Sequence, residues 1–233
     1  EKLPNENDLA TVYMNRAITY DSLTYYSQAL TDYSQAVEIR ERMHQEGRLP
    51  DNYLAEVYTR WASTFESLGR HEEALTYHSR AVDFRERLHR EGQLQDENAL
   101  AETYISRAVT YHSLSSYENA LTDYSQALEI RECLHQRGRL PDENDLATVY
   151  MDRAATYYSL TRYKDALTDY SQALEIRECL HQKGRLPDEN KLATVYTNWA
   201  NTCYSLTRYD DALAGYSRAI EIWERMHQKG RLP

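Results

Sequence analysis

The sequence predicts an all-α solenoid on the strength of two observations. The first is an internal repeat of about 46 residues that fills the 233-residue chain five times. The second is that apolar residues recur at helical spacing in each unit, with no alternation typical of strands. Five glycines mark the period, each followed after one residue by Leu-Pro or, in one case, by Leu-Gln: Gly47, Gly92, Gly138, Gly184 and Gly230.

The period indicates one elongated domain in which each unit contacts mainly its neighbours. We therefore expect a single solenoid domain over residues 1–233. Its five units should span about 3–48, 49–93, 94–139, 140–185 and 186–231.

The fourth unit shows the expected order of elements. Asp142 is followed by acidic residues and then by an apolar stripe from Leu146 to Tyr157, as at the start of a helix. Residues 159–162 interrupt the stripe. A second helix of about 20 residues should follow and end at Gly184, which can take the left-handed geometry of a helix C-terminus. The Leu-Pro pair beyond it prevents continuation.

Aromatic and small residues keep fixed positions in the first part of each unit. In the first unit they are Tyr13, Ala17, Tyr20, Tyr26, Ala29, Tyr33 and Ala36, and the third and fourth units repeat them. This pattern resembles the tetratricopeptide repeat (TPR) family, and the long period resembles its kinesin light chain-like variant. The resemblance implies a right-handed α-solenoid of helix-turn-helix repeats that binds proteins.

Tyrosine is unusually frequent, with 21 residues against 2 phenylalanines. The small residues allow the two helices of a unit to approach closely, and the large rings fill the space beside them. A thin two-layer solenoid buries few rings completely. We expect tyrosine to suit such places because its ring packs while its hydroxyl reaches water or a carbonyl at the edge.

In such arrays the inner, concave wall is lined by the first helix of each unit, here called helix A. Its exposed positions vary most between the five units. We expect them to form a groove for an extended peptide or a partner helix, in which asparagines bond the peptide backbone and tyrosines anchor side chains. Drift on a solvated face is the alternative. The candidate residues are Met14, Asn15, Ile18, Arg60, Ser106, Val109, His112, Met151, Asp152, Tyr158, Asn198, Asn201 and Tyr204.

No residue pattern predicts catalysis, a cofactor or a metal site. There is no glycine-rich phosphate loop, Gly-x-Ser-x-Gly or His-Glu-x-x-His motif. A histidine recurs near the end of each second helix, for example His135, but its neighbour Cys133 points to nearly the opposite side of a helix, and zinc needs converging ligands. A capping role accounts better for these histidines.

Composition restricts the partners and the compartment. A net charge of −10 disfavours nucleic acid. No apolar run approaches a membrane span, and no signal peptide is visible. Three cysteines are too few for a disulfide framework, which favours a reducing, cytoplasmic location. We expect protein or peptide partners, with no membrane association.

A second hypothesis is a structural or regulatory spacer within a larger signalling protein. The chain starts and stops at an inter-unit loop and lacks an obvious polar capping helix, as a piece excised from a longer array would. Exposed ends of this kind could stack, so end-to-end self-association is also expected.

Overall fold

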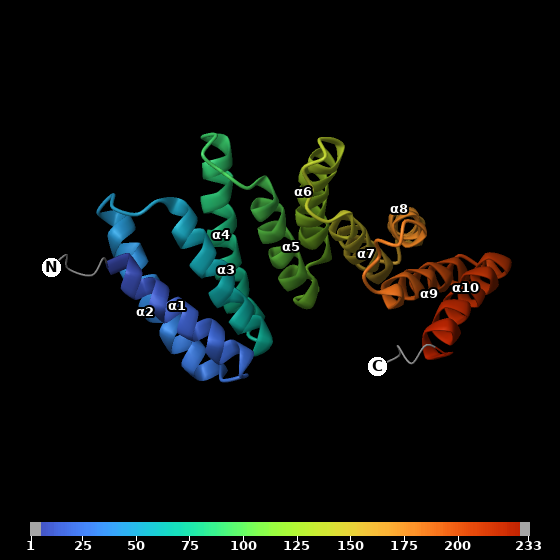
Figure 1. Cartoon of the computed structure of the whole chain (residues 1–233), viewed down its shortest axis with the longest axis horizontal. Coiled ribbons are helices and arrows are strands. Elements are labelled where there is room, and N and C mark those ends of the chain that lie inside the picture. Colours follow the sequence, from blue (N-terminus) through green and yellow to red (C-terminus); the bar gives the residue numbers. More distant parts are fainter. Residues whose placement is uncertain (1–5, 229–233) are drawn as a thin grey trace. The chain divides into compact units, whose positions relative to one another are not determined.

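The computed structural model describes residues 6–228, which form ten α-helices in five successive pairs and no strands (Figure 1). The predicted all-α helical repeat fold is confirmed. In each pair a 17-residue helix A precedes a 20-residue helix B. The helices are α1 (Glu6–Ser22), α2 (Tyr26–Gln45), α3 (Asp51–Ser67), α4 (His71–Arg90), α5 (Glu97–Ser113), α6 (Tyr117–Gln136), α7 (Glu143–Ser159), α8 (Tyr163–Gln182), α9 (Glu189–Ser205) and α10 (Tyr209–Gln228).

The helices fall into two compact units. Unit 1 is Glu1–Ser116 and contains α1–α5, and unit 2 is Tyr117–Pro233 and contains α6–α10. The boundary lies in the connection between α5 and α6. A single domain over the whole chain stays a prediction, and the outer ends of the first and fifth predicted repeats lie outside the described residues.

The helices begin and end as the local sequence predicts. The Asp142 side chain accepts a hydrogen bond from the Asn144 backbone N–H, which caps α7. At the end of α8, Gly184 has a φ of 64°, and the Arg185 N–H donates to the Leu180 carbonyl at 2.8 Å. This is the glycine-terminated helix end that the repeat pattern indicates.

The hairpins pack through the small residues of the repeat. Ala17, Ala29 and Ala36 are fully buried, which brings α1 and α2 close together, and Tyr33 is buried beside them. Helix A of the next repeat then packs on helix B, as Leu54 and Val57 of α3 do against the same core.

A tyrosine of helix A donates its hydroxyl proton to a glutamate of the preceding helix B. Tyr104 bonds the Glu86 carboxylate at 2.6 Å, and burial together with such a bond raises the pKa of Tyr196 to about 12. The sequence predicts water or a carbonyl as the partner of the tyrosine hydroxyl, whereas in the structure the partner is a glutamate carboxylate. Phenylalanine could not make the bond. The other pairs are Tyr58–Glu41, Tyr150–Glu132 and Tyr196–Glu178.

A buried arginine of helix B also joins each repeat to the next. Arg40 is 1% exposed and donates to the Tyr53 carbonyl, in the first turn of α3, at 2.9 Å. Three further arginines make the same contact at 2.7–3.0 Å: Arg85 with Ala99, Arg131 with Asp145 and Arg177 with Lys191. Each guanidinium therefore reaches a fixed point on the following helix A.

One helix A position and its helix B partner vary together. Arg16 pairs with Asp32 through two hydrogen bonds, and Arg153 pairs with Asp169 in the same way. The second and fifth repeats carry tryptophan at this position. Trp61 lies against Tyr77, with ring centroids 4.1 Å apart. Trp199 lies over Gly215, where a Cβ atom would approach the indole to 3.0 Å.

Replacing Tyr104 by Phe should lower the free energy of unfolding by about 1 kcal/mol, because it removes one hydrogen bond to a carboxylate that can regain water. Urea unfolding followed by circular dichroism measures the change. Tyr25→Phe is the control, since the Tyr25 ring is 52% exposed. Equal effects of the two substitutions would show that the Glu86 bond does not stabilise the stack.

Trp199→Arg and Gly215→Asp should each destabilise unit 2. The first leaves a guanidinium without its acid, and the second places a carboxylate against the indole. Together they should restore much of the loss by recreating the Arg153–Asp169 pair. A double-mutant cycle from urea unfolding should give a favourable coupling of about 1–3 kcal/mol. If the losses of stability in the two single variants simply add in the double variant, positions 199 and 215 do not exchange as a pair.

Candidate functional site

A cavity of about 440 Å³ opens on the helix A face of unit 1. The structure brings three predicted residues together around it: Ile18 from α1, Arg60 from α3 and Ser106 from α5. A second cavity, of about 610 Å³, adjoins it and extends to the loop between α4 and α5. Arg60 lines both cavities, so it lies at the centre of a larger hollow.

Arg60 differs from most arginines of the molecule in having no bonded partner. Within residues 6–228, only Arg60 and Arg90 make neither a hydrogen bond nor an ion pair with another side chain or carbonyl. Arg90 is the last residue of α4, where a cation faces the carbonyl end of the helix. Arg60 is exposed in the middle of α3.

The carboxylates that line the cavity with Arg60 contact other side chains, Glu102 through Asn98 for example, although the Oδ1 atom of Asp21 is buried without a hydrogen-bond partner. Asp21 accepts a hydrogen bond from the Thr64 hydroxyl at 2.6 Å. Glu56 lies 4.0 Å from the Arg40 guanidinium. The cavity therefore contains a cation whose charge is not matched by a direct contact within the protein.

Met14 does not lie on the predicted exposed face. It is 5% exposed, and its sulfur lies 3.5 Å from the buried Arg40 guanidinium. Helical spacing places Met14 beside Ile18, but packing of the second repeat covers it. Met151 is half-buried in the equivalent contact with Arg177.

The remaining candidates differ in the exposure and bonding of their side chains. Asn15 is exposed, and Asn198 is half-buried. The Asn201 amide oxygen accepts from the Tyr216 hydroxyl at 2.6 Å, so its amide group is partly engaged within the protein. Val109 is 40% exposed and His112 is half-buried, both on α5.

Tyr158 and Tyr204 lie at the ends of α7 and α9, beside the hairpin turns. They are 37% and 61% exposed, and each ring meets a tyrosine of the following helix B edge-on: Tyr158 with Tyr163, and Tyr204 with Tyr209. The Tyr158 hydroxyl is also 3.1 Å from the Ser205 hydroxyl. These rings belong to unit 2, whereas the cavities around Arg60 belong to unit 1.

Asp152 occupies on α7 the position that Arg60 occupies on α3. Burial raises the pKa of its carboxyl group to about 6, against the opposing attraction of Arg177 and Arg131. Its side chain is therefore only partly ionised in mildly acidic solution, and charging it costs free energy.

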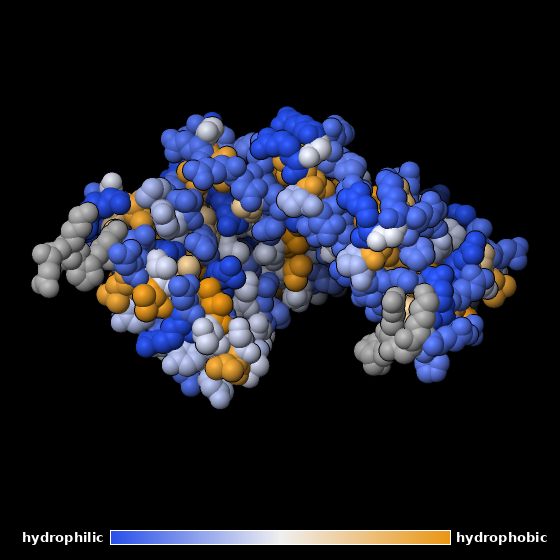
Figure 2. Space-filling view, viewed as in Figure 1, coloured by the Kyte–Doolittle hydropathy of each residue, from blue (hydrophilic) through white to orange (hydrophobic). Residues whose placement is uncertain are grey.

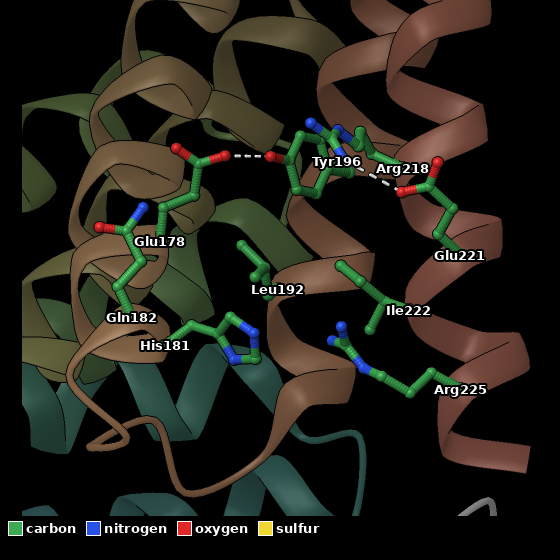
Figure 3. A pocket seen from close by; sticks show the side chains of 9 residues that line it. All are labelled: Glu178, His181, Gln182, Leu192, Tyr196, Arg218, Glu221, Ile222 and Arg225. Carbon is green, nitrogen blue, oxygen red and sulfur yellow. Dashed lines mark hydrogen bonds and ion pairs between the residues drawn. The ribbon is translucent and has the colours of Figure 1, made fainter. Parts of the chain in front are cut away.

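A second hollow, on the helix B side of unit 2, was missed in the sequence. Its volume is about 380 Å³. Figure 3 shows its walls, formed by Glu178, His181 and Gln182 of α8 and by α10, with Leu192 and Tyr196 of α9 between them. The lining of this hollow also differs between repeats. Arg218 and Arg225 of the fifth repeat occupy the positions that Gln172 and Cys179 occupy in the fourth.

The wider surface supplies little further chemistry. Hydrophilic residues dominate the face in Figure 2, with hydrophobic residues in small groups. No three His, Cys, Asp or Glu residues of the described chain are placed to hold a metal ion. Of the five helix-end histidines, His44 has its Nδ1 atom 3.3 Å from the Leu49 carbonyl and 3.3 Å from Asp51. Among the ten helices, none is long and apolar enough to cross a membrane.

Asp152→Asn should remove part of the pH dependence of stability. The folded-state pKa of about 6 lies above the ordinary value of 3.8, so the folded state binds the proton more readily than the unfolded chain. Stability should therefore fall by about 2 kcal/mol as pH rises from about 4 to about 6. Asp152→Asn should abolish this fall, measured by urea unfolding across that range. Asp210→Asn, at an exposed site, should keep it, and identical curves for both variants would refute the assignment.

Known structures share the fold over nearly the whole chain. BtubC (BKLC) from P. vanneervenii aligns with a TM-score of 0.77 and 21% identity, over 98% of this chain and 84% of that chain. A putative kinesin light chain with nearly identical TPR-like repeats, from Podosopora anserina, aligns with a TM-score of 0.72 and 12% identity, over 96% and 99%. YrrB, a TPR protein, aligns with a TM-score of 0.60 and 17% identity, over 90% and 84%.

Sequence comparison identifies the repeat itself. No curated protein matches the chain at a significant level. Family models of the tetratricopeptide repeat match residues 10–42, 53–132 and 146–181, which together make up more than half of the chain. The chain therefore belongs to the tetratricopeptide repeat family.

Proposed function

We propose that this protein-interaction module holds a peptide segment of its partner against the helix A face of unit 1, with Arg60 contacting an acidic group of the peptide. The observation that carries the proposal is the unpaired guanidinium in the hollow between α1, α3 and α5. The solved structure of YrrB is described as having an unusual peptide-binding site, which supports a peptide as the ligand class.

The size and lining of the hollow suit a peptide. Adjoining cavities of about 440 and 610 Å³ provide room for several side chains of an extended segment. Ile18 offers a half-buried apolar contact. Thr59 and Ser63 donate their hydroxyl protons to backbone carbonyls of α3, so their oxygens can accept from peptide N–H groups.

The free contact at Arg60, rather than the total charge of the hollow, favours an acidic group on the peptide, because four carboxylates also line the two cavities: Asp21, Glu56, Asp96 and Glu102. Arg85, the other arginine that lines both cavities, already donates to the Ala99 carbonyl. Arg60 is the cation that can still form a bidentate pair with a carboxylate. The net charge of −10 opposes non-specific binding of anions, so an acidic ligand needs this local contact.

The helix A face of unit 2 offers a different chemistry at the same positions. Asp152 and Asn198 stand where unit 1 has Arg60. An asparagine amide can bond the backbone of an extended peptide, and a half-buried carboxylate accepts N–H donors. We propose that these residues, with Tyr158 and Tyr204, contact a separate part of the partner.

Selection of random dodecapeptides displayed on phage against the intact chain should enrich sequences that contain Asp or Glu. The best selected peptide should bind Arg60→Gln at least about tenfold more weakly, measured by fluorescence anisotropy, because the charge pair is lost. Arg90→Gln is the matched control, since it removes the other unpaired arginine outside the hollow, and it should bind normally. A chain that selects no peptide, as a pure spacer would, contradicts the proposal. Equal loss in both variants also contradicts it.

A further inference from the structure

Two successive helices B leave a groove above the helix A that lies between them. In unit 1 the groove between α2 and α4, over α3, contains the Phe84 ring. This ring stacks on Tyr58 with centroids 6.0 Å apart and meets His44 edge-on at 5.5 Å. The Arg87 guanidinium lies 4.8 Å from the centre of the same ring. An aromatic ring in contact with all three helices therefore fills this first groove.

Two arginines of α4 match the carboxylates of the first groove. Arg87 donates to Asp51 of α3 at 2.6 Å, and Arg80 donates to Glu41 of α2 at 3.2 Å. The first groove thus contains one aromatic ring and two guanidinium groups, each of which contacts a carboxylate.

The equivalent groove of unit 2, between α6 and α8 over α7, lacks all three groups. Smaller, uncharged residues occupy the positions of Phe84, Arg80 and Arg87 there, in the order Ile176, Gln172 and Cys179. These residues line a cavity of about 420 Å³, which we call the α6–α8 pocket. Its apolar wall includes Leu146, which is 5% exposed, and the half-buried Ile176. The volume is in the range of cavities that hold a ligand.

The carboxylates of the α6–α8 pocket are left without the two guanidinium groups. Glu132 accepts a tyrosine hydroxyl proton of α7, but no arginine contacts it within residues 6–228. Glu175 is exposed, and its carboxylate has no ion pair or hydrogen bond among these residues. Glu143 lies 3.3 Å from Arg185 at the surface. Three carboxylates therefore line the pocket against one lysine, Lys183.

The opening of the α6–α8 pocket does not depend on the ends of the chain. Its lining runs from Glu132 to Lys183 and comes from three consecutive helices of unit 2. The next repeat is in place beside it, because Leu174 of α8 packs against Leu192 and Ala193 of α9.

We propose that the α6–α8 pocket binds a segment of a partner protein in which a phenylalanine or tyrosine lies next to an arginine or lysine. The aromatic ring takes the place that Phe84 fills in the first groove, against Tyr150 and Ile176. The basic side chain takes the place of the missing guanidinium groups, beside Glu132 and Glu175. This site is separate from the hollow around Arg60, which belongs to unit 1.

The groove one repeat later has a different charge (Figure 3). Ile222 again stands in the place of the ring, but Arg218 and Arg225 occupy both arginine positions. Arg218 donates to Glu221 at 3.0 Å, and Arg225 donates to Glu189 at 2.7 Å. Since arginines already contact these carboxylates, this groove should bind a basic segment poorly. It therefore serves as an internal control.

Methyl NMR of the intact chain with ¹³C-labelled isoleucine δ1 methyl groups tests the proposal with capped dipeptides. Acetyl-Phe-Arg-amide should move the Ile176 signal upfield in a saturable way, because the ring lies over that methyl group, and should leave the Ile222 signal in place. Acetyl-Ala-Arg-amide lacks the ring and acetyl-Phe-Glu-amide lacks the cation. Each should bind at Ile176 at least about fivefold more weakly.

Cys179→Arg restores a guanidinium group of the first groove, at a position where Arg87 and Arg225 are accommodated. It should weaken the binding of acetyl-Phe-Arg-amide about fivefold, because the introduced cation competes with the ligand for Glu143. Cys179→Ser is the matched control and should bind as the parent chain does. Four results would each overturn the proposal: an Ile176 signal that does not move, equal binding of acetyl-Phe-Glu-amide, an equal shift of Ile222, or equal binding by the two Cys179 variants.

Discussion

The stack depends on a buried or half-buried arginine of each of the first four helices B, which donates to a backbone carbonyl in the first turn of the next helix A. The Arg177 side chain is only 3% exposed, and this burial lowers the pKa of its guanidinium to about 10. A desolvated cation is costly without its hydrogen bonds, so the carbonyl of Lys191 must lie where Arg177 can reach it. A shift of α9 by one turn would break that bond. The arginine therefore sets the register of one hairpin on the next.

The other contacts between repeats follow from this register. With α3 placed by Arg40, the Tyr58 hydroxyl meets the Glu41 carboxylate, one residue beyond the arginine. Arginine and glutamate lie in the extended part of helix B that gives the repeat its long period. The long period and one recurring tyrosine of helix A are thus linked: each of the first four repeats supplies an arginine and a glutamate, and the next repeat supplies a carbonyl and that tyrosine.

The positions that vary between repeats are of two kinds. Some change in compensated pairs, as when Trp199 faces Gly215 where Arg153 faces Asp169. These exchanges preserve packing and indicate no ligand. Other positions differ between repeats without a compensating substitution on the facing helix. Arg60 and Asp152, at equivalent places on α3 and α7, are examples. Only the second kind alters what the helix A face can bind, and for this reason the proposed peptide contact rests on Arg60.

Much of the fold could be predicted because its signals are local. The caps at Asp142 and Gly184, the hairpin turns and the helix lengths depend on residues within one helix or its flanks, and periodicity shows which residues share a face. Periodicity does not show what covers that face. Met14 and Ile18 lie one turn apart, yet Arg40 of α2 and the second repeat cover Met14. The acceptor of the Tyr104 hydroxyl and the isolation of Arg60 likewise depend on side chains from other helices. The sequence by itself determined the repeat, its helices and its family, whereas only tertiary packing decided which side chains are covered and which remain available to a partner.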